Sequence, residues 1–158
     1  MTERPLQIAE ELLALPTAPF AEELTLAYVR AFADRTPGVE ASADGAGNVT
    51  VRTSGEAGAH PLVLVAHLDH PGFTVDGADA STVAMAFAGG LAARAVPVGT
   101  PVDLFRRGSP EPVGRASLTS VSERRGRLTG ALAEIDHGEA VVGGFATWTF
   151  PHLPAGVD

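Results

Sequence analysis

The chain has 158 residues, enough for one ordinary domain or two small units, and its composition of 45% hydrophobic and 19% charged residues is that of a soluble globular protein. Nineteen acidic against eleven basic residues give a formal charge of -8, which does not indicate the basic surface that nucleic-acid binding requires. The chain has no cysteine, so disulfides and thiolate metal sites are excluded, and any metal would have to be held by His, Asp and Glu.

Targeting signals and membrane spans are not expected. The first 30 residues carry acidic side chains and no continuous apolar core, unlike a signal peptide. No run of about 18 apolar residues is present to cross a bilayer. We therefore expect a cytoplasmic protein that does not bind a membrane.

Two amphipathic helices are predicted near the N-terminus. The first, "RPLQIAEELLAL" at 4–15, places apolar residues at helical spacing, and the second, "FAEELTLAYVRAFADR" at 20–35, repeats the pattern. Glu22 and Glu23 lie near the positive end of the second helix dipole, and the Pro-Gly pair at 37–38 ends this helix.

Two kinds of strand follow the helices. Residues 39–53, "VEASADGAGNVTVRT", alternate in polarity on either side of a Gly-rich turn at 44–48, which predicts a hairpin. "PLVLVA" is instead apolar at every position from Leu62 to Ala66, as in a strand covered on both faces. The pattern predicts a central strand of a helix-covered sheet.

The composition changes after about residue 76. Short apolar runs alternate with Gly, Pro and charged turns, at the spacing of a small all-β barrel or sandwich, so residues 77–150 are predicted to form a β subdomain with no long helix. Residues 151–158 resemble a connector. Residues 1–76 contain too few elements to cover both faces of the predicted sheet, so the fold class we expect is α/β: the first part of a helix-flanked sheet, its second half absent, carrying an inserted small β-barrel.

A possible metal site follows the predicted central strand, where "VAHLDHPGF" places His67, Asp69 and His70. Ligands bind beyond the carboxyl ends of strands in open α/β sheets, and residues two apart in an extended segment project to the same side. His67 and Asp69 can therefore share one site, with the imidazole as metal ligand and the carboxylate orienting it. The alternative is that His67 is a hydrogen-bonded core histidine and Asp69 a turn former.

This motif and its surroundings resemble the glutamyl aminopeptidase type of dinuclear metallo-aminopeptidase, the family of the deblocking and tetrahedral aminopeptidases. Two N-terminal helices, "FAEEL", "DGAGNVTV" ahead of the motif, and "GGLAARAVPVGTPVDLF" opening a β insertion all occur in the family's order. The resemblance covers essentially the whole chain as the N-terminal portion of a longer protein. It implies a hydrolase that binds two divalent ions, zinc or cobalt, releases N-terminal amino acids from peptide substrates, and forms homo-oligomers.

By this resemblance His67 is a metal ligand and Asp69 is the catalytic, orienting carboxylate. The family's other ligands and its Glu base follow the β insertion and cannot be matched here, so this chain alone is expected to be inactive. The family commonly has Glu at the position of His70, to which we assign no role, and Asp158 lacks the context of a bridging ligand. His137, between two acidic residues in "IDHGEA", is expected on a barrel turn.

Two other functions remain open at this point. One is a related metallohydrolase with the same fold, such as a carboxypeptidase or deacylase. The other is a non-enzymatic module whose β-barrel mediates binding or assembly.

Overall fold

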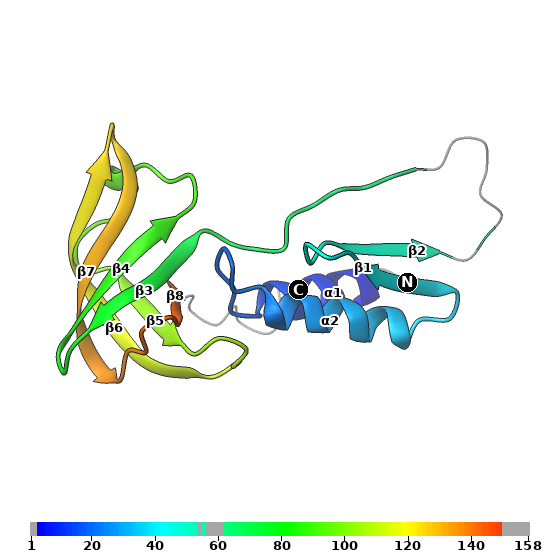
Figure 1. The fold of residues 1–158 in the computed structure, drawn as a ribbon, viewed down its shortest axis with the longest axis horizontal. Coiled ribbons are helices and arrows are strands. Elements are labelled where there is room, and N and C mark those ends of the chain that lie inside the picture. The colour runs from blue at the N-terminus through cyan, green and yellow to red at the C-terminus, as the bar shows by residue number, and fades with distance from the viewer. Residues whose placement is uncertain (1–2, 54, 56–61, 150–158) are drawn as a thin grey trace.

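The computed structural model describes residues 3–53, 55 and 62–149, which form an N-terminal helical unit and a β-barrel joined by an extended segment (Figure 1). The N-terminal unit contains helix α1 (Glu3–Leu13), helix α2 (Glu23–Asp34), and strands β1 (Val39–Ala43) and β2 (Val49–Thr53). Both predicted helices and the predicted hairpin are confirmed. The connector expected at residues 151–158 lies outside the described residues.

The hairpin is fixed by its turn. The carboxylate of Asp44 accepts hydrogen bonds from the backbone N–H of Ala46 and of Asn48 and from the Asn48 amide, each at 2.8–2.9 Å. Asp and Asn favour such turns because their short side chains replace backbone partners. Strands β1 and β2 pair in antiparallel register, and the helices lie along one side of this two-stranded sheet (Figure 1).

The second unit is a closed antiparallel barrel, which confirms the predicted β subdomain. Its strand order is β3-β4-β7-β6-β5-β8, and the only helical turn within it is the short η1 (Ala93–Ala95), so the described residues of the barrel contain no α-helix. The strands are β3 (Gly72–Ala78), β4 (Thr82–Ala88), β5 (Pro101–Phe105), β6 (Pro112–Arg124), β7 (Arg127–Gly138) and β8 (Phe145–Trp148). Because β3 begins at Gly72, the boundary expected at residue 77 lies inside a barrel strand.

The barrel encloses its own hydrophobic core. Phe73 is 1% exposed and meets Phe87 and Trp148 in edge-to-face contacts, each with ring centroids 5.2 Å apart. Other side chains that are essentially fully buried in this core are Leu104, Leu118, Val83 and Val102, whereas Phe145 is buried in a second cluster with Phe105, Ala18 and Ala21. A barrel leaves no unpaired edge strand, so this unit pairs the backbones of its strands internally.

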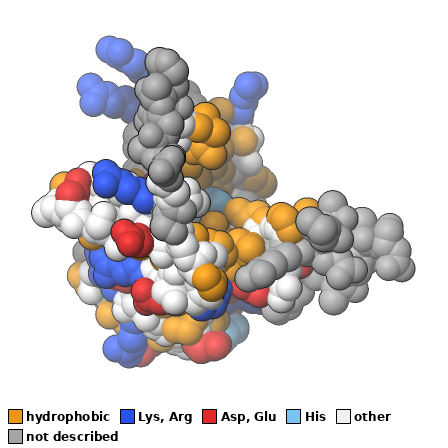
Figure 2. All heavy atoms as spheres, turned by 90° about the vertical axis from the view of Figure 1, so that its right-hand side faces the viewer, with side chains coloured by type: hydrophobic (Ala, Val, Ile, Leu, Met, Phe, Trp, Pro, Cys, Tyr) orange, Lys and Arg blue, Asp and Glu red, His pale blue; other side chains and the backbone are white. Residues whose placement is uncertain are grey.

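The predicted central strand at 62–66 is wrong. Residues 62–70 are extended but belong to no strand of the described structure, and the four side chains from Leu62 to Val65 are 73–92% exposed. A strand requires a neighbouring backbone to pair with, and no strand among the described residues lies beside this segment. Figure 2 views the molecule from the right-hand side of Figure 1 and shows hydrophobic side chains at the surface. The structure thus supports the barrel but not the metallopeptidase catalytic domain.

Candidate functional site

His67 and Asp69 lie on the extended segment that leads into the barrel, close to the start of β3 (Figure 1). The imidazole Nδ1 of His67 is 2.9 Å from the backbone carbonyl oxygen of Asp69 and 3.3 Å from the Oδ1 atom of its carboxylate. The carbonyl can only accept, so this hydrogen bond places the ring proton on Nδ1. The spacing rule that put the two side chains on one side of the segment is therefore confirmed.

The exposure of the two side chains bears on whether His67 is a core histidine or an open metal ligand. The His67 side chain is 80% exposed, whereas that of Asp69 is 29% exposed. A core histidine would be enclosed, and the described residues do not enclose His67. Nε2 of His67 has no hydrogen bond to any described residue and carries its lone pair toward solvent when Nδ1 is protonated, which is the form of histidine that binds metals.

The pair supplies only part of a metal site. Among residues 3–53, 55 and 62–149, no group of three or more His, Asp or Glu side chains is arranged to hold one ion. A catalytic zinc typically keeps three protein ligands. These residues therefore fit one ligand and its orienting partner, and the remaining donors of a complete site do not come from the described part of the chain.

The other histidines do not join this pair. His70 is partly buried, with no hydrogen bond to a described residue. His137 was expected on a barrel turn, but it lies within β7, exposed and opposite Arg115 of β6. The prediction placed the turn too early, because the alternation of the strand continues through its charged end. His60 and His152 lie outside the described residues.

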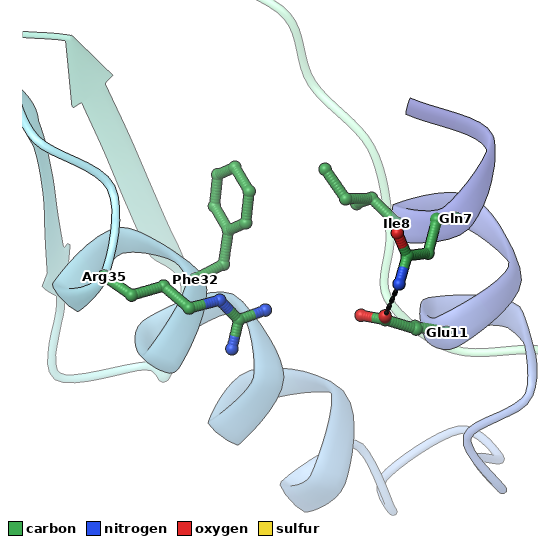
Figure 3. Close-up of a pocket in the computed structure, with 5 residues that line it drawn as sticks. All are labelled: Gln7, Ile8, Glu11, Phe32 and Arg35. Carbon is green, nitrogen blue, oxygen red and sulfur yellow. Dashed lines mark hydrogen bonds between the residues drawn. The ribbon is translucent and has the colours of Figure 1, made fainter. Parts of the chain in front are cut away.

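A hollow between α1 and α2 does not include the His67 pair. It is lined by Ile8 and Phe32 together with polar side chains that have partners of their own (Figure 3). Glu11 accepts hydrogen bonds from Gln7 at 3.1 Å and from the Tyr28 hydroxyl at 2.7 Å, and the latter bond raises the pKa of Tyr28. The guanidinium of Arg35 lies over the rings of Tyr28 and Phe32. The hydrogen bond from Tyr28 to Glu11 joins the two helices and the other contacts order the side chains around it, so we assign the hollow a structural role.

Neither a scan of protein-family models nor searches of curated proteins and of solved structures found a match to this chain. In the described part of the chain, no helix is both long and apolar enough to cross a membrane. The site must therefore be judged on its own geometry.

The contact between Arg107 and Glu23 could not be predicted from the sequence. Arg107 lies in the hairpin "RRGSPEP", which suggests a solvated turn, and Glu23 lies in the first turn of α2. In the structure the Nε–H of Arg107 donates a hydrogen bond to the Glu23 carboxylate, although the two residues are 84 positions apart in sequence. No local pattern could have predicted the contact, because it depends on how the helical unit lies against the barrel.

Proposed function

We propose that this chain is the N-terminal portion of a cytoplasmic, metal-dependent aminopeptidase that forms homo-oligomers, in which His67 binds one of two divalent ions and Asp69 orients the imidazole. The observation that carries the proposal is the His67 geometry. Nδ1 donates to the backbone carbonyl of Asp69 and lies 3.3 Å from its carboxylate, while Nε2 is left open on an exposed ring. A fixed tautomer with a free second nitrogen is the arrangement that metal-binding histidines use.

The ions, zinc or cobalt, would supply Lewis acidity toward a peptide carbonyl and a water molecule of lowered pKa. His67 would hold its Nε2 lone pair in a fixed direction. The Asp69 carboxylate, 3.3 Å from Nδ1, would restrain rotation of the ring and make it a better donor. Further ligands and a general base would come from chain segments other than the described residues, so the described part alone would be inactive.

The experiment compares His67→Ala, Asp69→Asn and His137→Ala in the natural full-length protein. Metal content is measured by elemental analysis, and turnover by hydrolysis of aminoacyl anilides. His67→Ala should abolish turnover and lower the content of one metal. Asp69→Asn should keep much of the metal and lose about 10- to 100-fold in rate, as expected for an orienting group.

His137→Ala is the control, because His137 is an exposed histidine on the far end of a barrel strand. It should retain wild-type metal content and activity. Full activity in His67→Ala would overturn the metallopeptidase proposal. Activity on acylated or C-terminal substrates that depends on His67 would point instead to a deacylase or carboxypeptidase, and a lack of bound metal in the wild type would favour a binding or assembly module.

A further inference from the structure

An arginine of the barrel contacts the loop between α1 and α2. Arg107, in the turn between β5 and β6, donates from Nε to Oε1 of Glu23 at 2.7 Å, and from Nη2 to the same carboxylate and to the backbone carbonyl of Phe20. The planar guanidinium can make these bonds together because its donors form a rigid fork. Arg107 therefore contacts both the first turn of α2 and the loop that precedes it.

Phe20 has a backbone conformation that needs such support. Its φ angle is 69°, in the left-handed region that bulky residues rarely adopt, and its side chain is 74% exposed, so burial of the ring does not explain the conformation. Its N–H donates to Oε1 of Glu22 at 2.8 Å, and its carbonyl accepts from Arg107. Strained conformations persist where the surroundings fix them, and Arg107 fixes one side of this peptide.

Apolar contacts lie beneath the same junction. Ala18 and Ala21 are buried in one cluster with Phe105 and Phe145 of the barrel, whose rings stack at 5.2 Å with an interplanar angle of 13°. The N–H of Ala21 donates to the carbonyl of Ala18 at 2.9 Å, which closes the loop over these rings. The loop at residues 17–21 thus packs on the barrel, with Arg107 at the edge of the packed surface.

The junction reaches the end of the segment that carries the candidate site. A Cβ atom on Gly72 would lie 2.8 Å from the Cβ of Ala18 and 3.0 Å from the carbonyl of Ala146, so β3 begins pressed between the loop and β8. A Cβ atom on Gly89, the residue after β4, would lie 2.7 Å from the Cβ of Pro71. The residues directly after His70 are therefore held on one side by the barrel and on the other by the loop that Arg107 fastens.

We infer that Arg107 is a positioning residue, which clamps the loop at 17–21 against the barrel and thereby fixes the placement of the segment bearing His67 and Asp69. Its effect on turnover rests on the proposed function, whereas its effect on the segment does not. Without the clamp, the barrel keeps its closed core, but the loop and the segment beside it move relative to one another. A misplacement of about 1 Å at a catalytic group can cost about 100-fold in rate.

Arg106 provides a matched control. It is the adjacent residue in the same turn, carries the same charge and is similarly exposed. It pairs with Glu139, which belongs to the barrel and also lies at the surface. Arg106→Ala removes one arginine and one ion pair without touching the junction. Any effect of Arg107→Ala beyond that of Arg106→Ala therefore belongs to the contact with the helical unit.

The experiment uses the natural full-length protein and the variants Arg107→Ala, Arg106→Ala, Arg107→Lys and the exchanged pair Glu23→Arg with Arg107→Glu. Hydrogen exchange is followed in peptides covering residues 17–23 and 67–72, and kcat, KM and metal content are measured for each protein. Arg107→Ala should exchange severalfold faster in both peptides and lower kcat by about tenfold, with KM and melting temperature close to those of Arg106→Ala. Arg107→Lys should recover part of the loss. The exchanged pair should recover less, because a carboxylate at 107 cannot donate to the Phe20 carbonyl and an arginine at 23 meets the positive end of the helix dipole.

The inference is overturned if Arg107→Ala and Arg106→Ala give the same exchange in both peptides, or if Arg107→Ala speeds exchange at 17–23 alone. His67→Ala in the same assays separates this inference from the proposed function. If His67→Ala keeps full activity while Arg107→Ala loosens both peptides, the metallopeptidase proposal fails and the clamp stands. If His67→Ala is inactive while Arg107→Ala matches Arg106→Ala throughout, the clamp fails and the proposed function stands.

Discussion

The barrel and the N-terminal helical unit differ in whether each covers its own apolar surface. The barrel closes all six strands upon themselves and buries Phe73, Leu104 and Leu118 to 1% exposure. The N-terminal unit leaves Leu6 and Leu13 more than half exposed, and so is the run from Leu62 to Val65 in the segment that joins the two units. A closed barrel is complete as a structural unit, whereas a two-stranded sheet with two helices is too small to enclose a core.

The exposed apolar side chains outside the barrel form a surface that another structure can cover. Large exposed apolar patches mark surfaces that another structure covers. The segment at 62–65 is the clearest instance, because it is extended, apolar at every position, and carries backbone groups without strand partners among the described residues. His67 lies directly after it, between the N-terminal helical unit and the barrel.

The largest expected effect tests the barrel core. Phe73→Ala removes a ring that is 1% exposed and contacts two other aromatic rings, so it should lower the free energy of unfolding by about 3–5 kcal/mol. Leu132→Ala, on β7 but 51% exposed, should change it by about 0.5 kcal/mol or less. Denaturant unfolding followed by circular dichroism measures both, and equal effects would show that the barrel core does not dominate stability.

The second prediction tests the open unit. The chain should self-associate and bind hydrophobic dyes through the segment at 62–65, and Val63→Arg with Val65→Arg should reduce both, because charges oppose pairing and burial of this segment. Val98→Arg, at an exposed valine outside the segment, should leave them unchanged. Sedimentation and dye fluorescence provide the measurements. A wild-type chain that stays monomeric at high concentration without binding dye would show that the segment is covered within the chain.

The smallest effect concerns a turn of the barrel. Hydrogen bonds from the Ser81 backbone N–H and from the Thr82 hydroxyl and N–H lower the pKa of Asp79 from 3.8 to about 2. Because the folded-state pKa is depressed, the carboxylate stabilises the fold above about pH 4, and this contribution is lost as the pH falls through about 2. Asp79→Ala should lower the melting temperature at pH 7 by a few degrees at most, and the difference from wild type should shrink between pH 4 and 2.

Asp76→Ala serves as the control for this turn, since Asp76 is an exposed aspartate of β3 that accepts a hydrogen bond from the Thr74 hydroxyl at 3.3 Å. At pH 7 it should lower the melting temperature less than Asp79→Ala does, because fewer hydrogen bonds are lost. A constant difference between Asp79→Ala and wild type down to pH 2 would contradict the assigned cause of the pKa shift.

The amino-acid sequence by itself determined the local elements of this protein. Helical spacing predicted α1 and α2, and alternating polarity on either side of the Gly-rich turn at 44–48 predicted the first hairpin, because both depend on residues close together in the chain. Alternation with Gly and Pro turns predicted the β subdomain. The i and i+2 spacing also predicted that His67 and Asp69 share one side, since an extended segment fixes that geometry without any tertiary contact.

Only the tertiary structure decided which elements find partners. "PLVLVA" has the composition of a buried strand, but strand pairing depends on a neighbouring backbone, and none is present beside it in the described residues. The junction of Arg107 with Glu23 and Phe20 likewise arises from packing across 84 residues of sequence. Periodicity reports which face of an element is apolar, whereas long-range packing alone determines what covers that face.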